Sequence, residues 1–141
     1  MDNDIENFTL LLKELKRVYG SYVSEIYYAR DNWNTVANND IARAEDPYEK
    51  TWALNDALYS IESIDRILSG KIKVDLNDSH CVDYLLDATR YQIHLHEEWG
   101  WSVTKCYKRI RQIDKDFDTC CSLFEDFFKS RNESKKNTEG V

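Results

Sequence analysis

The chain has 141 residues, a length typical of one domain that buries a sizeable core. It contains only four glycines and one proline, which argues against turn-rich sandwiches and barrels, collagen and linker-like disorder. Lys and Arg number 19 and Asp and Glu 26, and the net charge of −7 argues against a globally basic protein that binds nucleic acid directly.

No apolar run approaches the ~18 residues that a membrane-spanning helix needs, and the acidic start Met1–Asp4 does not resemble a secretory signal peptide. We therefore expect a cytoplasmic protein without membrane contact. No CxxC pair offers a zinc or redox motif. The four cysteines are accordingly expected to stay reduced and to fill apolar space: Cys81, Cys106, Cys120 and Cys121.

A seven-residue period of apolar side chains predicts a long helix over residues 5–36. Leu11 and Val18 widen the apolar seam, which is typical of helices in bundles rather than of narrow two-stranded coiled coils. Gly20 interrupts the pattern and predicts a bend or a close helix contact. The two seam lines are Ile5, Leu12, Tyr19, Ile26, Trp33 and Phe8, Leu15, Tyr22, Ala29, Val36.

A second helix is predicted to begin at residues 46–49 and to end at residues 69–70. Asp46 is a favourable N-cap, Pro47 suits the first helical position, and Gly70 suits a left-handed C-cap. Residues 71–76 alternate polar and apolar side chains but have no partner strand, which indicates an extended connector. The expected inner face of the helix consists of Leu54, Ala57, Leu58, Ile61, Ile64 and Leu68.

Two further seven-residue lines predict a third helical segment that starts after residues 77–79 and reaches Lys129. The phase of the lines is kept across Gly100, which favours one kinked helix, while a hairpin at residues 99–101 would give two helices. The lines are Val82, Thr89, His96, Val103, Ile110, Phe117, Phe124 and Leu85, Gln92, Trp99, Cys106, Ile113, Cys120, Phe127.

The predicted fold is therefore all-α: an elongated bundle of three long helical segments, or of four helices if the third segment breaks near Gly100. Residues 1–130 are expected to form one helical-bundle domain. Residues 131–141 are polar and are expected to form a disordered tail.

The third segment changes character where Thr89, Gln92 and His96 replace apolar residues on its inner lines. Two interpretations stay open: a satisfied layer of buried polar groups that fixes helix register, which we favour, and a pocket or partner groove at the kink. His94 and His96 point about 200° apart on a helix, so we expect neither a metal site nor a cofactor.

Arg90 and His96 have the spacing of the loose Arg-x(4–6)-His pattern, and in this the chain resembles HEPN-type ribonucleases, which are small all-helical proteins. The resemblance implies metal-independent RNA cleavage, with His96 as general base and Arg90 stabilising the phosphate charge. Tyr91 stands where that family usually carries a polar residue. On a straight helix Arg90 and His96 lie about 240° apart, so a shared site needs a helix end or a dimer.

Aromatic residues outside the seams indicate an interaction surface instead, because aromatic and arginine side chains are the usual anchors of protein interfaces. The competing interpretation is that the second helix is central and these rings belong to the core. The candidate interaction residues are Trp52, Tyr59 and Arg66 on the second helix, Tyr27 and Tyr28 on the first, and Trp101 on the third.

Charge is also uneven, since residues 75–98 contain six acidic residues and Arg90 as the only arginine or lysine. A solvated charged face is the ordinary explanation, and an acidic surface that occupies a basic groove is the sharper one. We therefore expect a non-enzymatic interaction or inhibitor protein that binds another protein. A small, acidic, helical chain of this composition is typical of phage and viral accessory factors. The alternatives are the ribonuclease and a homo-oligomeric structural bundle.

Overall fold

The computed structural model describes residues 2–31, 47–99 and 105–139, and this part of the chain forms an all-helical bundle without strands, as predicted. Its four helices are α1 (Asp2–Asp31), α3 (Pro47–Leu68), α4 (Asp83–Trp99) and α5 (Lys105–Glu139). Of the two alternatives for the third segment, the single kinked helix is wrong and the four-helix alternative is confirmed, because α4 and α5 are separate helices that pack against each other. The chain reverses direction between α4 and α5, but the phase of the apolar lines is unbroken because both helices face the same core.

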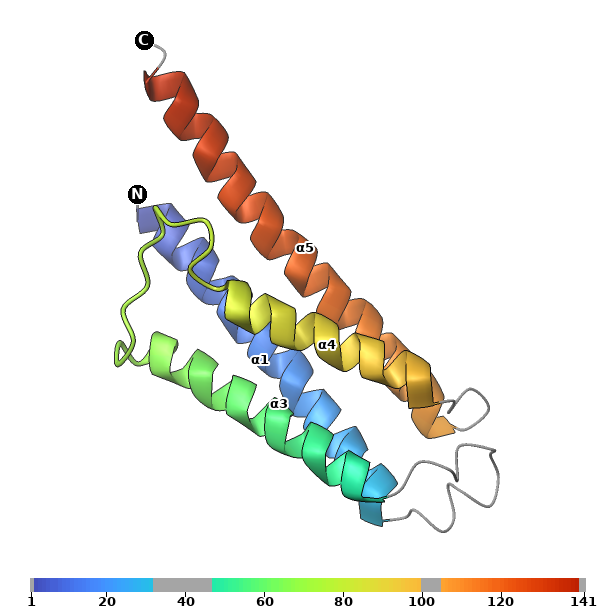
Figure 1. Cartoon of the computed structure of the whole chain (residues 1–141). Coiled ribbons are helices and arrows are strands. Elements are labelled where there is room, and N and C mark those ends of the chain that lie inside the picture. The colour runs from blue at the N-terminus through green and yellow to red at the C-terminus, as the bar shows by residue number, and fades with distance from the viewer. Residues whose placement is uncertain (1, 32–46, 100–104, 140–141) are drawn as a thin grey trace.

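The helices alternate in direction around the bundle (Figure 1). The helix α1 packs along α3 and α5, while α4 packs against α5 and, less extensively, against α3. The helices α1 and α4 therefore occupy opposite corners, so contacts between them cross the interior of the bundle. The helix α5 extends beyond the other three at the end where α1 begins (Figure 1).

The apolar seam of α1 forms the centre of the core. Leu12, Leu15, Tyr19, Tyr22 and Ile26 are all 0–1% exposed. At the end of the bundle where α1 begins, the ring of Phe8 meets three rings of α5 at centroid distances of 5.8–6.2 Å. The three are Phe124, Phe127 and Phe128.

Two positions on the predicted helix faces are wrong. Ile5 and Leu58 are 60% and 41% exposed rather than buried. Leu58 follows the fully buried Ala57, and one residue turns an α-helix by about 100°, which carries the leucine out of the core. At Gly20, for which a bend or a close helix contact was predicted, a side chain would meet no atom within 4 Å, so the close contact is wrong.

The helix α3 ends as its sequence predicts. Gly70 has a φ of 80°, and its amide donates to the Ile67 carbonyl at 3.1 Å. The Ile72 amide donates to the Arg66 carbonyl at 3.1 Å, which completes a glycine-dependent helix cap. Residues 69–82 then lead to α4 without forming a strand.

The helix α5 continues through the segment for which composition predicts a disordered tail. Arg131 ties this end of α5 to the connector between α3 and α4: its guanidinium donates to the Leu76 carbonyl at 3.1 Å and to Asn77 Oδ1 at 3.2 Å. It also pairs with the Asp4 carboxylate of α1. The helix therefore extends at least two turns beyond the boundary expected at residue 131.

Candidate functional site

Three polar side chains of α4 lie inside the bundle, where the sequence predicted a polar layer. Thr89, Gln92 and His96 are 0%, 2% and 2% exposed. The Tyr19 hydroxyl of α1 lies 2.6 Å from Thr89 Oγ1. The Thr89 hydroxyl in turn donates to the Leu85 carbonyl at 2.8 Å. Tyr19 is therefore the donor to Thr89, because the threonine proton is already engaged.

A second tyrosine of α1 completes the layer. The Tyr22 hydroxyl donates to Gln92 Oε1 at 2.8 Å and lies 2.7 Å from His96 Nε2. The Gln92 amide nitrogen faces the Ala53 carbonyl of α3 at 3.4 Å, which fixes the orientation of the amide. Burial raises the pKa of the Tyr22 hydroxyl well above its ordinary value, so the group stays protonated and can donate.

The proton count of this network assigns a role to His96. A hydroxyl has one proton, and Tyr22 gives it to Gln92, so His96 Nε2 completes its contact with Tyr22 as the donor. On the other side of the ring, His96 Nδ1 lies 2.6 Å from Asp114 Oδ1 of α5. The layer thereby joins all four helices. These bonds confirm the interpretation as a satisfied polar layer.

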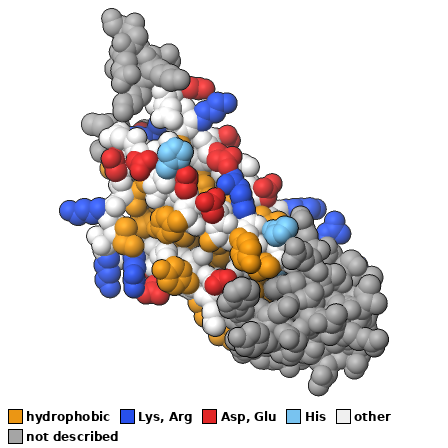
Figure 2. Space-filling view, viewed as in Figure 1, with side chains coloured by type: hydrophobic (Ala, Val, Ile, Leu, Met, Phe, Trp, Pro, Cys, Tyr) orange, Lys and Arg blue, Asp and Glu red, His pale blue; other side chains and the backbone are white. Residues whose placement is uncertain are grey.

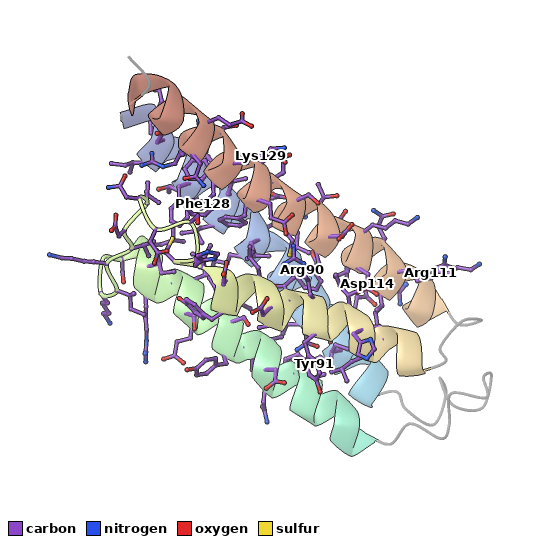
Figure 3. The ribbon with its side chains drawn as sticks, turned by 45° about the horizontal axis from the view of Figure 1, so that its top comes forward. Arg90, Tyr91, Arg111, Asp114, Phe128 and Lys129 are labelled. Atoms are coloured by element: carbon purple, nitrogen blue, oxygen red, sulfur yellow. The ribbon has the colours of Figure 1, made fainter. Side chains whose placement is uncertain are left out.

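The two residues of the ribonuclease resemblance do not come together in the chain. Arg90 is exposed and forms an ion pair with Glu125 of α5, whereas His96 is buried among Tyr22, Gln92 and Asp114. Figure 3 shows Arg90 on the side of α4 toward α5. The two side chains thus serve different contacts, and a phosphate group at Arg90 would have no access to the His96 ring within one chain.

The residues predicted for interaction are placed as follows. Tyr59 is 69% exposed and Tyr27 39% exposed, so neither ring belongs to the core. Arg66 is exposed and its guanidinium pairs with Glu62 at 2.7 Å on the same helix. The side chains of Trp52 and Tyr28, and the whole of Trp101, lie outside the described residues.

Two exposed tyrosines of α4 that the sequence analysis did not single out join Tyr59. Tyr84 and Tyr91 are 49% and 46% exposed and are seven residues apart, two turns along one side of α4. Figure 3 shows Tyr91 on the side of α4 toward α3. The Tyr59 hydroxyl acts electrostatically on Tyr84 and contributes to its raised pKa, of which burial is the main cause. We call Tyr59, Tyr84 and Tyr91 the tyrosine surface.

The tyrosine surface lies along α3 and α4. Of the bundle's four neighbouring helix pairs, α3 and α4 make the fewest contacts, so rings between them stay partly accessible. The face in view in Figure 2 carries hydrophobic side chains over α3 and α4, with acidic side chains beside them. A spacing of seven residues outside the predicted seam was the available signal for Tyr84 and Tyr91.

The thiols that the structure describes are not candidate nucleophiles. Cys120 and Cys121 are buried in α5, and burial raises their pKa to about 12 and about 11. Cys81 is partly buried, and burial together with nearby carboxylates raises its pKa. All three thiols are free.

Two open grooves lie at the end of the bundle where α1 begins and α5 ends. One, of about 580 Å³, is formed by the start of α1 and residues 67–76 and is largely apolar. The other, of about 530 Å³, lies between residues 79–86 and 125–133 and is lined by Leu86 and Phe128 together with charged and polar residues. Neither contains residues of the polar layer or of the tyrosine surface.

Within residues 2–31, 47–99 and 105–139, no three His, Cys, Asp or Glu side chains gather as metal ligands would, and no helix has the length and apolar character to cross a membrane. Comparisons with protein families, curated proteins and solved structures find no match.

Proposed function

We propose that the protein acts by binding another protein through the tyrosine surface of α3 and α4. The observation that carries this proposal is the exposure of three large rings, 46–69%, on adjoining sides of two helices. Tyrosine combines a large apolar area with a hydroxyl and has few rotatable bonds, so that it loses little entropy in an interface. A small helical domain bound in this way would act as an adaptor or, by covering a functional surface of its partner, as an inhibitor.

The burial of His96 away from Arg90 favours this binding role over the ribonuclease alternative. A homo-oligomeric bundle remains a separate hypothesis that uses the same exposed rings. The two can be distinguished by what contacts the tyrosine surface in the cell: a different chain or a second copy.

The test is site-specific photocrosslinking in cells of the native source. A benzoyl-phenylalanine at position 84 should capture a specific protein that the same probe at Leu10, a residue 61% exposed on α1, does not capture. Tyr59→Ala should reduce capture by position 84 strongly, because truncation of an interface anchor typically costs ~2 kcal/mol, about thirtyfold in affinity.

Tyr59→Ala should also melt at the temperature of the parent protein, because the ring is mostly exposed. Equal capture by Tyr59→Ala, or identical products from positions 84 and 10, would contradict the proposal. A crosslink to a second copy of the chain would instead establish the homo-oligomeric alternative.

A further inference from the structure

Two carboxylates without an ion pair accompany the tyrosine surface. Asp56 precedes Tyr59 by three residues, one turn of α3, so the two side chains share one side of the helix. Asp87 stands three residues after Tyr84 and four before Tyr91 on the outer side of α4. Among the described residues, neither Asp56 nor Asp87 has an ion pair or a side-chain hydrogen bond.

The arginines nearest along the two helices are already neutralised. Arg90 pairs with Glu125, and Arg66 pairs with Glu62 at 2.7 Å. The described part of the tyrosine surface therefore combines aromatic rings with negative charge that no described arginine or lysine offsets.

Asp56 is, in addition, partly dehydrated in the folded chain. It is partly buried, and burial raises the pKa of its carboxyl group. Its charge is also a minor cause of the raised pKa values of Tyr19 and Tyr22, of which burial is the main cause. An incoming cation would thus meet a carboxylate that has already lost part of its hydration, which lowers the desolvation cost of pairing.

We propose that the partner presents an arginine-bearing segment, whose guanidinium group pairs with Asp56 and stacks on the rings of the tyrosine surface. This inference rests on the proposed function and names the chemistry of its partner. A guanidinium group fits better than an ammonium group, because it is planar, donates two parallel hydrogen bonds to one carboxylate and stacks on aromatic faces. The net charge of −7 steers such a segment toward the protein.

The probes are three fluorescent peptides of about twelve residues that alternate serine with arginine, lysine or citrulline. Binding to the full chain is measured by fluorescence anisotropy at physiological salt, where distant charges are screened beyond about 8 Å. The arginine peptide should bind most tightly. The citrulline peptide, which keeps the shape without the charge, should bind at least tenfold more weakly, and the lysine peptide severalfold more weakly.

Two substitutions test the assigned contacts. Asp56→Asn should weaken binding of the arginine peptide about tenfold. It should not lower the melting temperature, because the partly buried carboxylate destabilises the folded state of the unbound protein. Tyr84→Leu keeps apolar bulk but loses the ring, and it should reduce the preference for arginine over lysine. The matched control is Glu6→Gln, which removes the same charge from an exposed residue of α1 and should change binding less than twofold.

Equal binding of the arginine and citrulline peptides, or equal losses from Glu6→Gln and Asp56→Asn, would overturn the inference by showing that no guanidinium site exists. If position 84 captures a partner in a Tyr59-dependent manner but the crosslinked segment carries no arginine, the inference fails while the proposed function stands. If the peptide results are as expected but no partner depends on Tyr59, the proposed function fails instead.

Discussion

The hydroxyl group of Tyr22 links α1 to two polar side chains of α4. It donates to Gln92 and accepts from His96, and both partners are 2% exposed. Water cannot replace the hydroxyl without opening the core, so each contact left unmade costs the desolvation of a buried polar group. Tyr19 differs, because both of its partners, Thr89 and Ser60, are helical hydroxyls. Thr89 keeps a hydrogen bond to the Leu85 carbonyl, and a serine in a helix can bond the carbonyl one turn before it.

We therefore expect Tyr22→Phe to lower the free energy of unfolding by about 2–4 kcal/mol and Tyr19→Phe by only about 1 kcal/mol. Urea unfolding followed by circular dichroism measures both values on proteins that differ from the parent by one oxygen atom. Equal losses for the two variants would show that the Gln92 and His96 contacts add nothing to the Tyr22 hydroxyl.

Asp56 should make the stability of the fold depend on pH in a distinct way. Its pKa is raised in the folded chain, so the native state holds this proton more tightly than the unfolded chain does. Its contribution to stability is therefore most favourable below the ordinary carboxyl range and is lost as the pH rises through the raised value. Asp56→Asn should thus melt close to the parent at acidic pH and progressively above it toward pH 7.

This difference is measured by thermal melts of the parent and Asp56→Asn at a series of pH values. Subtracting the two curves removes the titration of all other groups that the substitution leaves unchanged. A gap that stays constant, or that narrows toward neutral pH, would contradict the assignment of the unfavourable charge to Asp56.

At the scale of elements, a period in the sequence reports which side of a helix is buried but not what lies opposite. It identified the inner positions of Thr89, Gln92 and His96, because helical faces follow from residue spacing alone. It did not identify Tyr22 and Asp114 as their partners, because those contacts depend on how four helices are placed against one another.

The same limit explains the elements that were predicted incorrectly or missed. The phase of the apolar lines is continuous across Gly100 although α4 and α5 are separate antiparallel helices, since spacing does not record direction. Tyr84 and Tyr91 fall outside the seam, and their place beside α3 follows from the packing of the helices rather than from residue spacing.

Truncation at the end of α5 tests where the polar tail begins, since composition predicts residue 131 and α5 is helical to Glu139. Arg131 contacts Leu76, Asn77 and Asp4. A chain that ends at Ser130 should therefore be about 1–2 kcal/mol less stable than a chain that ends at Glu133 and keeps Arg131. Two chains of equal stability would show that the tail begins at residue 131, as composition predicts.

At the scale of the whole molecule, α1 holds the bundle together. It packs along both α3 and α5, and its tyrosines reach α4 across the interior. The other helices share less contact with one another, so a change that expels α1 removes the surface against which α3 and α5 are ordered. We therefore expect the bundle to unfold as one unit.

Leu15→Asp tests this dependence directly. Leu15 is 0% exposed at the centre of the α1 seam, and an unpaired carboxylate there costs several kcal/mol, comparable to the ~5–15 kcal/mol that stabilises a typical domain. Leu10→Asp introduces the same side chain in the same helix at a site that is 61% exposed, and it should leave stability nearly unchanged. Far-ultraviolet circular dichroism should show loss of helix signal from all four helices in Leu15→Asp and none in Leu10→Asp. A folded Leu15→Asp protein would refute the central position of α1, and a partial loss would mean that α4 and α5 stay folded as an independent hairpin.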